Sequence, residues 1–195
     1  VRQQVVDMFA NGDKEMATVI AEQSGVHPPK GSNVPVTKSS PALTKTSYYP
    51  YTQKVAVLIG NGFNGNEVSQ VLHLLQQYGV WIYIVREKLR TVTRSGGTEI
   101  KVDEAFVATY PVLYDALYVV GGTTENQEKV NQDVMHFVNE AYRHYKPIGV
   151  ATTGQSYIQR TKTNNLAGVI FAANNPDFGR DLIHAIAQQR FWNRK

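Results

Sequence analysis

Short apolar runs and stretches of amphipathic spacing follow one another from residue 54 to the end of the chain. A continuous apolar run of four to six residues is typical of a strand buried on both faces. Five such runs occur: Val55–Ile59, Val80–Val85, Ala116–Val120, Ile148–Ala151 and Gly168–Phe171. Strands that alternate with helices form a parallel sheet with right-handed crossovers, covered by helices on both faces. We therefore predict a doubly wound, mainly parallel α/β domain over residues 54–195.

Apolar positions recur at helical spacing between these runs. One helix carries its apolar residues from Val68 to Leu75 and ends at Gly79, and a longer one carries them from Val130 to Tyr145. Asn175-Pro176 predicts the start of a last helix, because a cap followed by proline is a favoured beginning. Residues 89–102, interrupted at Ser95-Gly96-Gly97, predict a small hairpin instead.

The first 53 residues follow a different pattern. Residues 1–26 are predicted to be helical, with Asp13 capping a helix that ends at Gly25 and whose Met16, Val19 and Ile20 share one apolar face. Residues 27–53 hold five of the eight prolines and no acidic residue. Proline removes amide donors, so we predict an extended linker there. The predicted division is 1–26, 27–53 and 54–195.

Composition narrows the classes of function. The chain of 195 residues has no cysteine, which excludes disulfides, thiolate metal sites and a cysteine nucleophile. Its 20 basic and 16 acidic residues leave a net charge of only +4, too weak to predict nucleic-acid binding. No apolar run approaches the roughly 20 residues of a membrane helix, and the five histidines lack a metal-binding arrangement. We expect no metal, membrane or nucleic-acid partner, and a cytoplasmic location.

A glycine-rich loop after the first strand is one candidate site. Gly60, Gly62 and Gly65 match G-x-G-x-x-G between a strand and a helix. Glu87 lies near the end of the second strand, where an acid that binds ribose would sit. The pattern is compatible with a nucleotide-binding module. An ordinary βα turn is the alternative, because the loop is rich in Asn and Gly, which form such turns.

A second candidate follows the fourth strand, in the sequence Ala151-Thr152-Thr153-Gly154-Gln155. A sharp turn from strand to helix is where many α/β enzymes display a nucleophile. A threonine hydroxyl requires an adjacent base, and the candidates are Glu67 from the first loop and His184 from the last helix. In the alternative interpretation, the two hydroxyls cap the following helix.

Several blocks of the chain together resemble the end of a large-subunit monofunctional haem catalase. They are residues 1–26, Pro35–Thr37, Ser39–Leu43, Lys54–Leu58, Tyr114–Leu117, Glu140–Ile148 and Gln189–Trp192. This resemblance implies that residues 1–26 are the end of the catalase helical region and that residues 54–195 form a flavodoxin-like domain. Residues 27–53 would connect the two. The haem site of such enzymes lies upstream, and no Arg-x-x-x-Tyr, the setting of their proximal tyrosine, occurs here.

The extra domain is itself similar to the class I glutamine amidotransferase-like superfamily, which includes deglycases and intracellular proteases. The resemblance places Thr152 where those proteins have a reactive cysteine, and Glu67 where they have its acid partner. Because a hydroxyl replaces the thiol, we expect this site to be vestigial and the domain to be non-catalytic.

The resulting expectation is an auxiliary domain of a catalase that dismutes hydrogen peroxide. It would hold no cofactor itself, with haem present only in the parent. Its partners would be the catalase core of the same chain, the neighbours in a homotetramer and, for the isolated fragment, unfolded client proteins. The alternatives are a hydrolase- or deglycase-like enzyme that uses Thr152 and Glu67, or a nucleotide-binding module that uses Gly60–Gly65.

Overall fold

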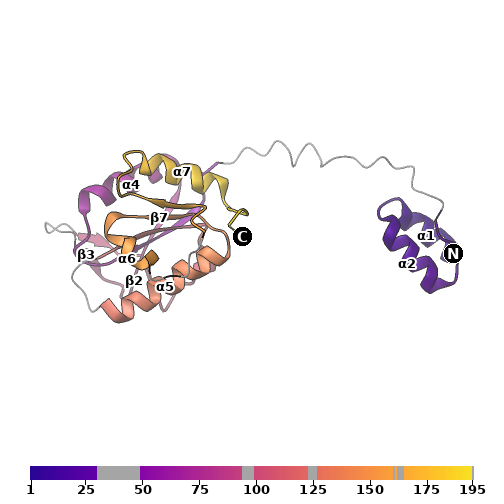
Figure 1. The fold of residues 1–195 in the computed structure, drawn as a ribbon. Coiled ribbons are helices and arrows are strands. Elements are labelled where there is room, and N and C mark those ends of the chain that lie inside the picture. The colour runs from indigo at the N-terminus through magenta and orange to yellow at the C-terminus, as the bar shows by residue number, and fades with distance from the viewer. Residues whose placement is uncertain (30–48, 94–98, 123–126, 160, 162–164, 195) are drawn as a thin grey trace. The chain divides into compact units, whose positions relative to one another are not determined.

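The computed structural model describes residues 1–29, 49–93, 99–122, 127–159, 161 and 165–194 (Figure 1). The chain divides into two compact units, Val1–Ser47 and Tyr48–Lys195. Most of the predicted linker, residues 30–48, lies outside the described residues.

The smaller unit contains two packed helices, α1 (Arg2–Ala10) and α2 (Lys14–Ser24). The Asp13 side chain accepts a hydrogen bond from the Met16 amide at 3.0 Å, and Gly25 ends α2 with a φ of 65°. Both helix boundaries of α2 are as predicted.

The apolar face predicted for α2 is not the face that packs against α1. Met16 and Val19 are exposed, whereas the small residues Ala17 and Ala21 are buried against Val6 and Ala10 of α1. Helices that pack through alanines approach closely, so the short side chains form the contact and the longer ones are left outside. Ile20, the third residue of the predicted face, is partly buried at the edge of this contact.

The larger unit is built on a six-stranded sheet in which all neighbouring strands are parallel. Its strand order is β5-β2-β1-β6-β7-β8. The bounds are β1 Lys54–Ile59, β2 Trp81–Arg86, β5 Glu104–Ala105, β6 Ala116–Gly121, β7 Ile148–Val150 and β8 Val169–Phe171. The five predicted strands are confirmed. The edge strand β5 was not predicted, because two residues are too few to show a periodicity.

The predicted hairpin is also present. It consists of β3 (Thr91–Thr93) and β4 (Glu99–Lys101), which pair antiparallel, with Val92 opposite Ile100. Its tip, residues 94–98, lies outside the described part of the chain.

Helices cover both faces of the sheet, which confirms the doubly wound architecture (Figure 1). One face is covered by α4 and α7, and the other by α5 and the short α6. The helical bounds are α4 Gly65–Gln77, 3-10 helix η1 Pro111–Leu113, α5 Gln127–Arg143, 3-10 helix η2 Thr152–Gly154, α6 Gln155–Gln159 and α7 Phe178–Gln188.

The last helix begins later than predicted. Asn175 and Pro176 precede α7, and the Asn175 side chain accepts from the Asp177 amide at 3.0 Å while donating to Asp181 at 2.9 Å. Asparagine thus closes a turn over the next two residues, and the helix starts after that turn. On this helix, Leu182, Ile183 and Ile186 are all buried.

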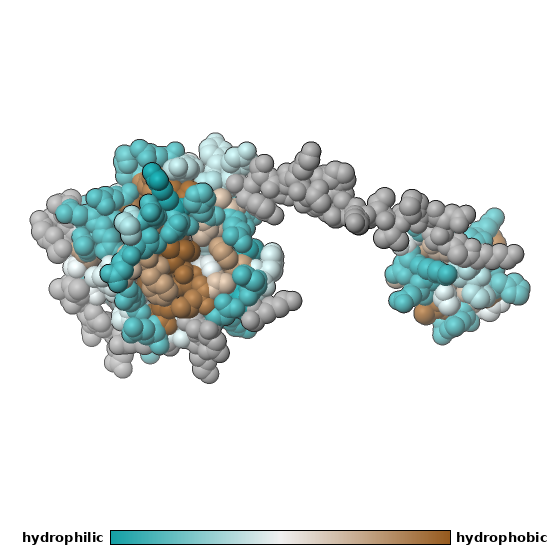
Figure 2. Space-filling view, turned by 45° about the horizontal axis from the view of Figure 1, so that its top comes forward, coloured by the Kyte–Doolittle hydropathy of each residue, from teal (hydrophilic) through white to brown (hydrophobic). Residues whose placement is uncertain are grey.

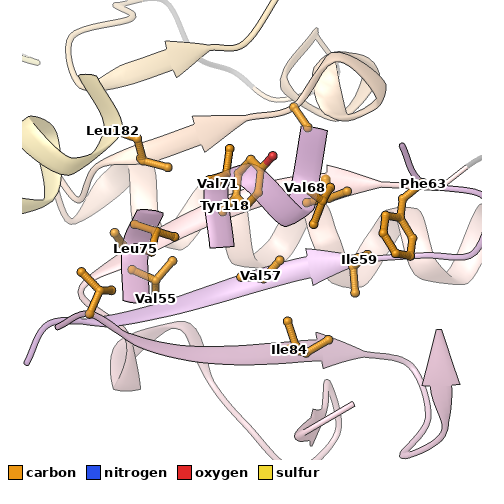
Figure 3. Close-up of a cluster of buried hydrophobic side chains, with 14 of the residues drawn as sticks. Val55, Val57, Ile59, Phe63, Val68, Val71, Leu75, Ile84, Tyr118 and Leu182 are labelled. Atoms are coloured by element: carbon orange, nitrogen blue, oxygen red, sulfur yellow. The ribbon is translucent and has the colours of Figure 1, made fainter. Parts of the chain in front are cut away.

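The parallel sheet has a separate core on each face. On β1, Val55, Val57 and Ile59 point toward α4 and α7, whereas Ala56 and Leu58 point toward α5 (Figure 3). Because residues 55–59 of β1 are all buried, on one side of the sheet or the other, the sequence shows a continuous apolar run there instead of an alternation. Apolar side chains also gather in one area of the outer surface, ringed by hydrophilic residues (Figure 2).

Candidate functional site

Loops from the strands β1, β6 and β7 meet at the carboxyl edge of the sheet. Strand β1 lies between β2 and β6, and β7 and β8 follow on the side of β6. If β1, β2, β6, β7 and β8 are counted from 1 to 5 in chain order, their order in the sheet is 2-1-3-4-5. In this order the switch point lies between β1 and β6. At this point the Gly60 amide donates to the Gly121 carbonyl at 2.9 Å. A Cβ added to Gly122 would lie 2.5 Å from the Gly60 carbonyl carbon, so the two loops approach too closely for a side chain there.

The structure brings together Glu67 and Thr152, the two residues that the sequence singled out. Oε1 of Glu67, in the first turn of α4, accepts hydrogen bonds from the Thr152 backbone amide at 2.9 Å and from its hydroxyl at 3.4 Å. The Asn64 side chain caps α4 by accepting from the amides of Asn66 and Glu67. A carboxylate in the first turn of a helix is favoured by the helix dipole.

The turn after β7 is tightly constrained. The Thr153 hydroxyl donates to the Val120 carbonyl at 2.6 Å, which ties the turn to β6. A Cβ added to Gly154 would lie 2.2 Å from the Val119 carbonyl oxygen, so only glycine fits there. The interpretation in which the two threonine hydroxyls cap the next helix is wrong, because both bond to other elements and η2 has no side-chain cap.

Tyr118 lies on β6 beside this pair and has an unusual environment. Its side chain is fully buried between the strands and α4, and its ring is 5.7 Å from that of Phe178 on α7 (Figure 3). In the described part of the chain, its hydroxyl is the buried side-chain polar atom without a hydrogen-bond partner. Burial and the negative charge of Glu67 raise the pKa of this hydroxyl.

A cavity of about 530 Å³ opens beside Glu67, between α4 and α7. Its apolar walls include Val71 and Leu74 on α4 and Phe178 on α7, and Asp177 and Arg180 also line it.

The glycine-rich loop uses its amides within the chain. The Gly62 amide donates to the Thr93 carbonyl at 3.0 Å, and Asn61 accepts from the Thr93 amide at 3.2 Å. Gly65 opens α4, whose next two amides are bonded to the Asn64 side chain. A pyrophosphate would require such amides as donors. Glu87 directly follows β2 and is half-buried, and nucleotide binding by this loop stays a prediction.

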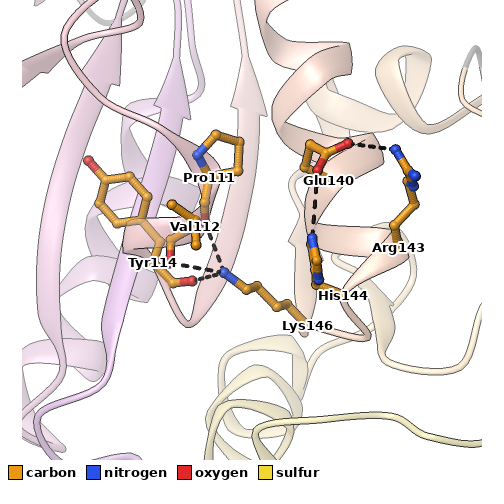
Figure 4. Close-up of polar contacts among 7 residues, drawn as sticks. All are labelled: Pro111, Val112, Tyr114, Glu140, Arg143, His144 and Lys146. Atoms are coloured by element: carbon orange, nitrogen blue, oxygen red, sulfur yellow. Dashed lines mark hydrogen bonds and ion pairs between the residues drawn. The ribbon is translucent and has the colours of Figure 1, made fainter.

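Lys146 and Arg194 are among the buried cations of the larger unit, and their burial was not expected from the sequence. The Lys146 ammonium donates to the carbonyls of Pro111 at 2.9 Å, Val112 at 3.4 Å and Tyr114 (Figure 4). The Arg194 guanidinium donates to three carbonyls, those of Ala167, Tyr142 and Lys146. Burial lowers the pKa of both side chains. Each side chain bonds to backbone that is tens of positions away in the sequence. No local sequence pattern predicts these contacts.

Within the residues described, no group of three or more His, Asp or Glu side chains is arranged to hold a metal ion. Of the helices in the same residues, none is long and apolar enough to cross a membrane.

Comparison with solved structures defines the class of fold. The ThiJ/PfpI domain protein from Brachyspira murdochii superposes with a TM-score of 0.56, at 12% identity, over 72% of this chain and 98% of that one. The larger unit is therefore a flavodoxin-like domain of the ThiJ/PfpI type, as the strand order indicates.

Sequence comparison identifies the family. Residues 51–195 match the C-terminal domain found in long catalases, and the chain belongs to this family. Catalase of Alkalihalophilus pseudofirmus is 40% identical over 196 residues, which cover all of this chain and 29% of that protein. Catalase-2 of Bacillus subtilis is 37% identical over 202 residues, again with 100% and 29% covered. The chain spans less than a third of the length of these catalases.

A more distant relative is the deglycase PH1704 of Pyrococcus horikoshii. It is 28% identical over 95 residues, which cover 49% of this chain and 57% of that protein.

Proposed function

We propose that this chain is a non-catalytic auxiliary part of a longer haem catalase subunit. The longer protein, the parent of this chain, would dismute hydrogen peroxide to water and oxygen. Membership of the family of C-terminal domains of long catalases supports this role. So does the share of 29% that the chain covers in each of two catalases. A cytoplasmic location is part of the same proposal.

One observation carries the non-catalytic part of the proposal. At the turn after β7, where a nucleophile would be displayed, the hydroxyl of Thr152 faces only the carboxylate of Glu67, at 3.4 Å. In the described part of the chain, no histidine is hydrogen-bonded to either residue. A carboxylate is too weak a base to remove the proton of an aliphatic hydroxyl, and a cysteine thiol, which ionises far more readily, is absent.

Haem belongs to the parent in this proposal. The chain contains no Arg-x-x-x-Tyr, the setting of the proximal ligand in the catalases that it resembles, so its residues do not fit the group. No step of peroxide chemistry is therefore assigned to this chain.

The auxiliary role would be to stabilise the assembly. The larger unit has a buried core on each face of its sheet. The smaller unit exposes apolar side chains on both of its helices, namely Val5, Met8, Phe9, Met16 and Val19. We propose that these contact the catalase core of the same chain, and that the domain also meets neighbours in a homotetramer.

Deletion from the full-length subunit tests this role. Removal of the segment equivalent to residues 54–195 is expected to lower the thermal midpoint and the tetramer fraction, while peroxide turnover per haem is retained. The 195-residue chain alone, with and without added haem, is expected to leave hydrogen peroxide intact. Peroxide decomposition by this chain, or a deletion variant with the midpoint and tetramer fraction of the full-length protein, would contradict the proposal.

For the isolated chain we also propose chaperone-like binding of unfolded clients, because the same apolar side chains of α1 and α2 would then be uncovered. The test mixes the chain with a thermally aggregating client and follows light scattering. Reduced scattering at equimolar chain is expected, and Met8→Ser together with Val19→Ser should weaken the effect. Unchanged scattering removes this idea.

The second candidate function is a hydrolase- or deglycase-like activity of Thr152 and Glu67. The hydrogen bond between the Thr152 hydroxyl and the Glu67 carboxylate favours it, together with the similarity to a deglycase over 49% of the chain. Thr152→Ala should then abolish hydrolysis of peptide or glycated substrates, and Thr152→Ser, which keeps a hydroxyl, should retain part of it. No turnover by the unmodified chain eliminates this candidate.

A further inference from the structure

The cavity between α4 and α7 has one hydrogen-bonding group of special interest, the carboxylate of Glu67. This side chain is half-buried, and its Oε1 is held by the Thr152 amide at 2.9 Å. A carboxylate offers about four acceptor sites, of which the two Thr152 donors use at most two. Among the described residues, no lysine, arginine or histidine forms an ion pair with it. Glu67 is therefore an oriented anion with acceptor capacity left over.

Tyr118 does not line the cavity, but its buried hydroxyl is a second polar group close to Glu67. It has no partner in the described chain, although buried hydroxyls in native proteins nearly always have one. In Figure 3 the hydroxyl oxygen is directed toward the turn of α4 that carries Val68, next in sequence to Glu67.

The rest of the lining defines the body of a ligand. Val71, Leu74 and Phe178 supply apolar surface on both sides of the cavity. Asp177 and Arg180 also line it, so that with Glu67 the charged side chains sum to −1. Two side-chain amides also line the cavity, those of Gln70 and Asn175, and the Asn175 amide bonds to the Asp177 amide and to Asp181.

We propose that this cavity binds a small organic cation, a primary ammonium or guanidinium group on a short apolar chain. The head group donates to Glu67, and the chain packs between Val71, Leu74 and Phe178. An ammonium group has three donors and no acceptor, so it can donate to the acceptor sites of the Glu67 carboxylate that Thr152 does not use. Its positive charge is also attracted by this carboxylate. The proposal does not depend on the auxiliary role in catalase, because it concerns binding alone.

Three probes of equal length test the charge preference on the unmodified 195-residue chain. Calorimetric titration compares n-pentylammonium with the neutral n-pentanol and the anionic pentanoate. We expect saturable binding of pentylammonium at least tenfold tighter than that of pentanol, and no heat from pentanoate. Amide NMR shifts on pentylammonium addition should be largest in α4 and the start of α7. Equal affinity for the three probes, or no saturable binding of pentylammonium, overturns the proposal.

Variants locate the head group. Glu67→Gln keeps an acceptor for the Thr152 amide and removes the charge, so pentylammonium affinity should fall at least tenfold. The control Glu140→Gln removes a carboxylate from α5, on the other face of the sheet, and should leave affinity unchanged. Far-UV circular dichroism establishes that each variant is folded. A folded Glu67→Gln protein with full affinity overturns the assignment, while peroxide and assembly measurements stay independent of this result.

Discussion

The backbone amide of Thr152 donates a hydrogen bond of 2.9 Å to Oε1 of Glu67, a residue 85 positions earlier in the chain. This bond joins the turn after β7 to the first turn of α4 across the carboxyl edge of the sheet. It is charge-assisted, and hydrogen bonds of that kind are about twice as strong as neutral ones.

Replacement of Glu67 should therefore affect stability as well as the site. Glu67→Ala loses the acceptor and the favourable charge in the first turn of α4, and we expect a loss of about 1–2 kcal/mol in the free energy of unfolding. Glu67→Gln keeps an acceptor and should lose only about 0.5 kcal/mol. Urea unfolding measures both. An alanine variant as stable as the unmodified chain would show that the bond contributes nothing.

Two buried tyrosines form a matched pair for a test of hydroxyl satisfaction. The Tyr114 hydroxyl is bonded to the Thr109 hydroxyl at 2.7 Å, whereas that of Tyr118 has no partner in the described chain. Tyr114→Phe should destabilise by about 1 kcal/mol, while Tyr118→Phe should leave stability unchanged or raise it by about 1 kcal/mol. Urea unfolding of both variants is the measurement. Equal losses at the two positions would mean that Tyr118 does have a partner in solution.

Replacement of the buried Lys146 should lower the free energy of unfolding of the larger unit. Its buried ammonium bonds to carbonyls of the segment 111–114 and holds η1 against the end of α5 (Figure 4). Lys146→Met leaves these buried carbonyls without a donor, and we expect a loss of about 2–3 kcal/mol. Lys101→Met, at an exposed position on β4, is the control and should change stability by less than about 0.5 kcal/mol.

The same lysine predicts a pH dependence. Burial lowers the pKa of Lys146 in the folded chain, so near that pKa the unfolded state binds more protons than the folded state. Stability from this group therefore rises with pH between the lowered pKa and the unfolded value of about 10.4. The difference in unfolding free energy between the unmodified chain and Lys146→Met should grow from pH 7 to pH 10. A constant difference over that range would contradict this prediction.

Gly154 should tolerate no side chain. A Cβ there would lie 2.2 Å from the Val119 carbonyl oxygen. Because the oxygen belongs to the backbone of β6 and Gly154 to the turn η2, a Cβ could be accommodated only if the turn moved away from the sheet. We expect Gly154→Ala to lose more than about 3 kcal/mol or to fail to fold, because close-packed interiors yield little. Gly60→Ala is the control on a neighbouring loop, since its Cβ would meet its nearest atom at an ordinary 3.4 Å. Thermal unfolding compares the two, and similar midpoints would contradict the prediction.

Much of the fold was predictable because its signals are local. Continuous apolar runs mark strands covered on both faces, and their alternation with helical spacing leads to the doubly wound class. Asp13 and Gly25 bound α2 as predicted, since capping depends on a few adjacent residues. Packing decided what local patterns did not predict: α2 contacts α1 through Ala17 and Ala21, and α7 starts after a turn closed by Asn175.

The sequence predicted which residues belong to the candidate site, but not how they contact one another. Glu67 and Thr152 stood out because they match positions in a superfamily, but their contact depends on the order of strands in the sheet. The unpartnered hydroxyl of Tyr118 and the three carbonyls around Lys146 had no local signal at all. Such environments are made by residues that are tens of positions apart.

By itself, then, the sequence determined the layers of this protein, the lack of any thiol chemistry and the relationship to catalases. Hydrophobic periodicity encodes which residues are buried, and composition excludes whole classes of reaction. Only the tertiary structure decided that the carboxylate of Glu67 meets the Thr152 amide beside a buried phenol and an open cavity. The physical reason is that strand order and crossover packing place the loops, and local periodicity carries no record of either.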